Sequence, residues 1–143
     1  MKDLLDKISS YNLFNYLLPG VVFVCASKYF TDYDFVQDKE LLGAFLYYFI
    51  GMVISRVGSI IIEPLLKWTE FVEFADYKDF VKASKIDAKI ELFSEVNNTY
   101  RTIIAMTLLL TALKLYNWLQ TNYEISNGIT YTILISSLFL MFL

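Results

Sequence analysis

Four long apolar blocks limit what this chain can fold into more than any other feature of its sequence. The blocks cover residues 12–30, 41–66, 102–119 and 128–143. A helix needs about 20 mostly apolar residues to cross a bilayer, within a range of about 17–25, and the first three blocks meet that length. Hydrophobic residues make up 57% of the chain, against roughly 45–50% in soluble domains. The sequence therefore predicts an all-α polytopic protein, a single membrane domain with four transmembrane helices.

The fourth block is short, and the sequence stops inside it without a charged residue. Either this span is thin and packs against its neighbours, or a natural C-terminal tail follows it, and we favour the second interpretation. The first block is not predicted to be a cleaved signal, because "MKDLLDK" before it holds two Lys and two Asp and so has no net positive charge.

Lysines are concentrated in one connecting segment, which fixes the predicted orientation. The loop "TDYDFVQDKE" after the first block has a single Lys, and "QTNYEISNG" after the third has no basic residue. The segment between the second and third blocks holds four lysines: Lys78, Lys82, Lys85 and Lys89. Loops rich in Lys and Arg stay in the cytoplasm. We therefore predict a membrane protein with cytoplasmic N- and C-termini.

The same lysine-rich segment, residues 69–100, has the apolar spacing of amphipathic helices. Its apolar side chains recur every three or four residues, with acids and lysines between them. This pattern predicts a cytoplasmic helical hairpin, or extensions of the second and third spans. Its apolar faces need a partner surface, either sister subunits or a separate cytoplasmic protein. The candidate partner-binding residues are Phe71, Phe74, Tyr77, Ile86, Ile90 and Phe93.

Small residues repeat every four positions in the second block, where Gly51, Ser55, Ser59 and then Glu63 form one helical stripe. Small residues at this spacing let two membrane helices approach closely. We predict that Gly51, Ser55 and Ser59 pack against another helix, within one subunit or between subunits of a homo-oligomer.

Arg56 and Glu63 are charged residues inside this apolar block. A charge deep in a bilayer costs about 3 kcal/mol or more, so each needs a partner, water or headgroups. The two backbones lie about 10 Å apart along a helix, so the side chains could almost meet, directly or through Ser59. In one interpretation Arg56, Glu63 and Ser59 line a polar path or bundle interior. In the other, the inner bilayer boundary falls near Arg56 and both charges touch headgroups.

Two prolines and one basic residue are further candidates for a structural role. Pro19-Gly20 and Pro64 predict kinks in the first two spans. Asn98 or Thr99 could cap the third span, with Arg101 as an anchor at the inner face. Three threonines could line a polar seam or bond back to their own helix: Thr102, Thr107 and Thr111.

Several functional classes are excluded by composition. The chain has no His and a single Cys, Cys25, which removes the commonest general base and any Cys-based zinc site. A net charge of −3 and the lack of a recognition motif argue against nucleic acid as a direct partner. We predict no catalytic residues, no metal site and no cofactor, and therefore no enzyme.

Two stretches, "SYNLFNYLLPGVVF" and "ELFSEVNNTYRTIIAM", together with four predicted spans, resemble small bacterial inner-membrane proteins of anti-phage defence loci. The resemblance implies a membrane-embedded component. Members of that functional class disrupt the membrane, or they anchor or sense for a cytoplasmic partner. It also implies a basic tail after the fourth span, which this sequence lacks.

The leading prediction is an oligomeric effector in the lipid bilayer that perturbs permeability when triggered. The alternative is a membrane anchor or sensor without a pore, which recruits a cytoplasmic effector through residues 69–100.

Overall fold

The structure is a computed structural model, and it describes residues 12–123, 132 and 136. Every regular element in these residues is helical, so the all-α prediction is confirmed. In chain order the elements are η1 (Leu13–Leu17), α3 (Leu18–Phe30), α4 (Glu40–Val57), η2 (Gly58–Ile62), α5 (Glu63–Trp68), α6 (Tyr77–Ile86) and α7 (Lys89–Tyr123).

Three continuous helical stretches are long and apolar enough to cross a membrane: Leu13–Phe30, Glu40–Trp68 and Lys89–Tyr123. They coincide with the first three predicted spans, although the third begins 13 residues earlier than the predicted 102–119. Apart from residues 132 and 136, the predicted span at 128–143 lies outside the described residues. In the most apolar window of α7 only 11% of residues are buried. An apolar surface this exposed is expected where lipid is the solvent.

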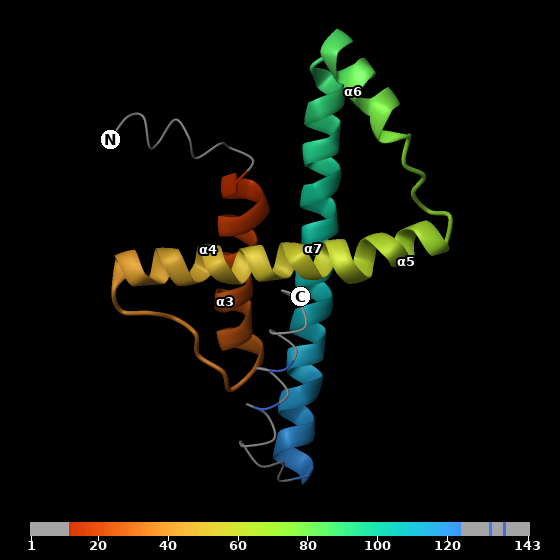
Figure 1. The fold of residues 1–143 in the computed structure, drawn as a ribbon. Coiled ribbons are helices and arrows are strands. Elements are labelled where there is room, and N and C mark those ends of the chain that lie inside the picture. Colours follow the sequence, from red (N-terminus) through yellow and green to blue (C-terminus); the bar gives the residue numbers. More distant parts are fainter. Residues whose placement is uncertain (1–11, 124–131, 133–135, 137–143) are drawn as a thin grey trace.

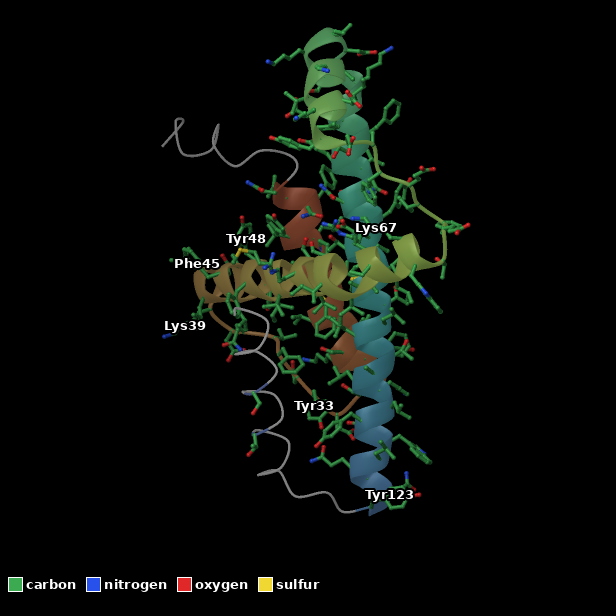
Figure 2. All side chains as sticks on the ribbon, turned by 45° about the vertical axis from the view of Figure 1, so that its right-hand side comes forward. Tyr33, Lys39, Phe45, Tyr48, Lys67 and Tyr123 are labelled. Carbon is green, nitrogen blue, oxygen red and sulfur yellow. The ribbon has the colours of Figure 1, made fainter. Side chains whose placement is uncertain are left out.

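The helices form a crossed arrangement rather than an upright bundle. α3 and α7 lie side by side and run in the same direction, while α4, η2 and α5 form one long rod that crosses both (Figure 1). The crossing is equally clear after a 45° turn, with Lys39 and Lys67 marking the two ends of the rod (Figure 2). A small core of buried apolar residues lies where the rod meets α7: Ile54, Val57, Ile62 and Ala105.

Glycines allow the rod to touch its neighbours backbone to backbone. A Cβ on Gly51 would lie 1.7 Å from the backbone oxygen of Tyr16, and a Cβ on Gly20 would lie 1.8 Å from that of Tyr47. No side chain fits at either position. Gly58 makes the corresponding contact with α7, where a Cβ would lie 3.3 Å from the Arg101 side chain. The close packing predicted for Gly51 is therefore used inside one chain, between α4 and η1.

A π-helical segment precedes each proline by the same offset. η1 ends two residues before Pro19, and η2 ends two residues before Pro64. Each segment has a hydrogen bond between residues five apart. The Leu18 N–H donates to Leu13 O in η1, and the Glu63 N–H donates to Gly58 O in η2. A proline lacks the N–H that would complete the ordinary four-residue pattern, and the wider turn lets the helix continue past it. The predicted interruptions at Pro19-Gly20 and Pro64 take this form.

The loop between α3 and α4 is fastened to the far end of α7. Asp32 N–H donates to Asn117 Oδ1 over 3.2 Å, and the Tyr33 hydroxyl donates to Gln120. Asp34 forms an ion pair of 2.8 Å with Lys28. This hydrogen-bonded lysine, together with the Val36 N–H, holds the pKa of the Asp34 carboxyl below its ordinary value. These contacts hold the end of α3 and the loop that follows it beside residues 117–120 of α7.

The segment between the rod and α7 is only partly helical. Residues 71–76 form no helix, so the prediction of a helical pattern carrying Phe71 and Phe74 is wrong. The chain leaves α5 through Glu70, whose φ of 57° lies in the left-handed region, and it then returns to α6. α6 packs against the first turns of α7 (Figure 1). Phe71 and Phe74 instead line the pocket beside the ion pairs described below.

Candidate functional site

The candidate site is the place where the rod crosses η1 and α7, and its first part is a polar junction of Asn15, Ser55 and Thr102. Thr102 Oγ1 lies 2.8 Å from Asn15 Oδ1 and 3.2 Å from Ser55 Oγ, and Asn15 Nδ2 donates to Ser55 Oγ over 3.2 Å. The relative exposure is 0% for Asn15 and Thr102 and 7% for Ser55. One polar residue from each of three elements is thus enclosed by apolar surroundings. A buried polar network of this kind specifies one mutual placement of the helices.

The Thr102 hydroxyl is predicted to be essential to this junction. Thr102→Val keeps the shape of the side chain but removes the buried hydroxyl that contacts Asn15 Oδ1 and Ser55 Oγ. An unsatisfied buried polar group costs about 1–3 kcal/mol, so we expect this loss of stability in unfolding curves followed by circular dichroism in detergent micelles.

Thr107→Val is the matched control for Thr102→Val. The Thr107 side chain is exposed, and its hydroxyl donates to Ile103 O one turn earlier in the same helix. We expect its removal to change stability by less than about 0.5 kcal/mol. Equal losses in the two variants would mean that the junction adds nothing beyond the propensity of Thr and Val in a helix.

The second part of the site is a charge cluster about two turns further along the rod, at Glu63. Glu63 accepts hydrogen bonds from Arg101 through one carboxylate oxygen and from Lys67 through the other, the latter over 2.8 Å. The exposed side-chain fractions are 13% for Arg101 and 24% for Glu63. The carboxylate therefore joins α5 to α7 and is neutralised within the chain.

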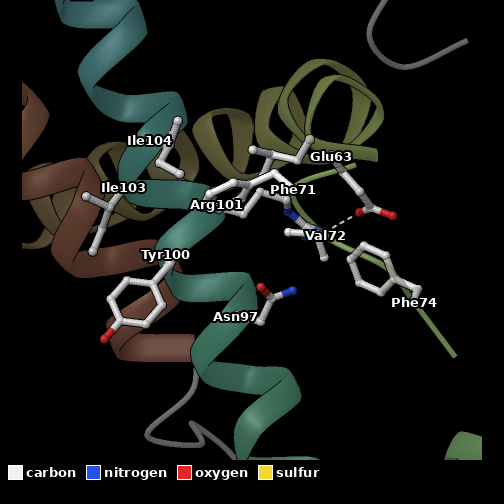
Figure 3. A pocket seen from close by; sticks show the side chains of 10 residues that line it. Glu63, Phe71, Val72, Phe74, Asn97, Tyr100, Arg101, Ile103 and Ile104 are labelled. Atoms are coloured by element: carbon white, nitrogen blue, oxygen red, sulfur yellow. Dashed lines mark hydrogen bonds and ion pairs between the residues drawn. The ribbon is translucent and has the colours of Figure 1, made fainter. Parts of the chain in front are cut away.

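A pocket of about 330 Å³ lies against this cluster (Figure 3). In that view the Arg101 and Glu63 side chains point toward each other, and the Phe71–Phe74 segment closes one side. Lys67 Nζ also lies 4.6 Å from the centroid of the Phe74 ring, within the range of a cation–π contact. The Phe74 ring therefore contacts the cluster at its exposed Lys67 end.

Arg56 takes no part in the charge cluster. Glu63 is bound to Arg101 and Lys67, and among the described residues Arg56 belongs to no ion pair. The π-helical segment η2 lies between the two residues and rotates less per residue than an α-helix, so Glu63 is moved off the helix face that carries Arg56. The predicted contact between Arg56 and Glu63 is not formed. Arg101 is more than an anchor at the end of a span, because it holds Glu63.

The predicted stripe of Gly51, Ser55 and Ser59 is used in three different ways. Gly51 contacts η1, Ser55 belongs to the polar junction, and the Ser59 hydroxyl donates to Ser55 O of its own helix over 3.2 Å. Thr102, Thr107 and Thr111 all bond back to their own helix, and Thr102 is the one of the three that also reaches other elements. Asn98 and Thr99 lie inside the continuous α7 and do not cap it.

The candidate partner-binding residues divide between two settings. Phe71 and Phe74 line the pocket beside Glu63. The others lie on α6 and the first turns of α7, where Ile90 is half-buried and the remaining three are exposed: Tyr77, Ile86 and Phe93.

Sequence reasoning missed Asn15 and the pairing of Arg101 with Glu63. Asn15 is one of two amides in the first apolar block, and a polar residue inside a span is by itself a signal of a buried partner. In the part of the chain that the structure describes, no group of three or more His, Cys, Asp or Glu residues could hold a metal ion. Comparisons with known proteins found no matching family model, no matching curated protein and no matching solved structure.

Proposed function

We propose that this chain is a membrane anchor or sensor of the bacterial inner membrane that presents residues 69–100 to a cytoplasmic protein partner. The observation that carries the proposal is α7, a single helix of 35 residues. At about 1.5 Å per residue it is about 52 Å long. Its first part, Lys89 to Tyr100, carries charges, whereas Thr102 to Leu119 contains the single charge Lys114. One rigid element thus joins a water-compatible end to an apolar one.

The polar junction and the charge cluster support this proposal. Both lie where α7 changes from charged to apolar, at Arg101 and Thr102. They bind α7 to the rod and to η1 at that level. A partner that displaces α6 or the start of α7 would therefore also displace the rod and η1. Because Glu63 is neutralised inside the chain, it is unsuited to line an ion path.

The orientation in this proposal can be tested with single thiols. Cys25→Ala removes the only native thiol, and Lys85→Cys then places one on α6, while Asn122→Cys places one at the opposite end of α7. A membrane-impermeant maleimide should label position 122 in intact cells and position 85 only in inverted vesicles. Labelling of position 85 from outside intact cells would disprove the proposed topology.

A second candidate function is an oligomeric effector that perturbs membrane permeability when triggered. It is favoured by the uncovered apolar flank of the rod, which holds four exposed side chains: Leu41, Phe45, Phe49 and Met52. Further copies of the chain would cover this flank, and Arg56 and Ser59 would then line the polar path without Glu63.

Ion flux separates the two candidates. Purified protein in liposomes should release no entrapped ions if the chain is an anchor, and release that depends on protein concentration would favour the effector. A bacterial defence system remains our proposed setting for either function, on the resemblance of the two sequence stretches given above.

A further inference from the structure

A second hollow, of about 320 Å³, also borders Arg101, and it does not include Glu63. It is formed by η1, α4, η2 and α7, and its lining residues are Tyr16, Phe49, Met52, Ser55, Arg56, Ser59 and Arg101. Two of these residues are arginines and none is acidic. The hollow therefore combines positive charge with apolar walls.

The two arginines differ in how their charges are satisfied. Arg101 is bound to Glu63, although its Nε atom is buried and has no hydrogen-bond partner among the described residues. Arg56 is exposed and pairs with no described acid. The Arg56 guanidinium group therefore has no acidic partner among the described residues, and the Arg101 guanidinium group has one unbonded nitrogen. An anion in the hollow would bind to both groups.

The position of the hollow selects the kind of anion. It lies at the level of Arg101, where α7 passes from its charged part to its apolar part. Phe49 and Met52 continue from it onto the exposed apolar flank of α4. An anion with an attached hydrocarbon chain would satisfy both surfaces, because its phosphate would meet Arg56 and its acyl chain would follow that flank.

We propose that this hollow binds the phosphate of an anionic phospholipid, with Arg56 as its principal ligand. The proposal rests on membrane association but not on either function above, and it gives Arg56 a role other than lining a path. A guanidinium group binds a phosphate through two parallel hydrogen bonds, which a lysine cannot reproduce.

The test is native mass spectrometry of the detergent-purified protein, titrated separately with phosphatidylglycerol, phosphatidylcholine and inorganic phosphate. We expect phosphatidylglycerol to bind more tightly than phosphatidylcholine. Arg56→Gln should weaken its binding about tenfold, as expected for the loss of one charged hydrogen-bonding group, and Arg56→Lys should weaken it less. Arg56 is exposed, so unfolding of the lipid-free variants should match the wild type.

Lys39→Gln is the matched control, because it removes an exposed cation at the far end of the same rod (Figure 2). It should leave phosphatidylglycerol binding unchanged. Equal binding by Arg56→Gln and the wild type, or an equal loss in Lys39→Gln, would overturn the proposal. So would inorganic phosphate that binds as tightly as the lipid, or an Arg56-dependent change in subunit number without lipid. The thiol-labelling result is independent of all these outcomes.

Discussion

Gly51→Ala is expected to separate the rod from η1 and to destabilise the protein by about 3 kcal/mol or more. The added Cβ would lie 1.7 Å from the backbone oxygen of Tyr16 and 2.5 Å from its carbonyl carbon. These are backbone atoms inside a helical segment, so no side chain can rotate to make room. The two elements must move apart, and the junction at Ser55, one turn further along the rod, would be pulled open with them. Denaturant titration in detergent micelles, followed by circular dichroism, measures the loss.

Gly43→Ala is the control for this prediction. Gly43 is also buried on α4, but a Cβ there would first meet the Tyr47 ring, at 3.3 Å. That ring is the end of a flexible side chain and can shift by a few tenths of an ångström. Alanine also favours a helix over glycine by about 0.5–1 kcal/mol, so we expect little change or a small gain. If both variants lost stability equally, the loss could not be attributed to the crossing.

Glu63→Leu is expected to have the next largest effect, a loss of about 2 kcal/mol. The variant leaves Arg101 with 13% of its side chain exposed and without its carboxylate. Removing one partner of a fully buried pair costs about 3–5 kcal/mol, and we reduce that range because Glu63 is 24% exposed. The same unfolding measurement applies. A second expected result is increased proteolysis of the 69–76 segment, because Phe71 and Phe74 line the pocket beside the cluster and Phe74 contacts Lys67.

Lys67→Ala separates the two partners of Glu63. Lys67 is half exposed, and pairs of this kind contribute less than about 1 kcal/mol. We therefore expect Lys67→Ala to cost much less than Glu63→Leu. A larger loss for Lys67→Ala would assign the stability to the Phe74 contact and the exposed pair, and it would remove Arg101 from the explanation.

The parts of the fold that depend on local patterns were predictable. Apolar length alone located three spans, because the bilayer requires a minimum number of apolar residues. Small residues at a spacing of four correctly indicated close packing at Gly51. The helical interpretation of Phe71 and Phe74 failed, because the chain leaves the helix at Glu70 and both residues line the pocket beside Glu63.

The pairing within the site was not predictable from local patterns. Glu63 has Arg56 seven residues away on the same chain segment and Arg101 38 residues away, and only the tertiary arrangement chooses between them. The π-helical segment η2 moves Glu63 off the face that carries Arg56. Its sign in the sequence is weak, because it consists of Pro64 six residues after Gly58. Asn15 was missed for a similar reason, because its partners come from two distant helices.

The unbroken backbone of α7 has a consequence for how its two ends can behave. Phe93 and Thr102 are nine residues apart on this helix, and at about 3.6 residues per turn they point in opposite directions. Neither can be reoriented about the helix axis without the other. If a ligand at Phe93 rotated α7 about its axis, Thr102 would rotate with it. The Thr102 hydroxyl would then turn away from Asn15 and Ser55.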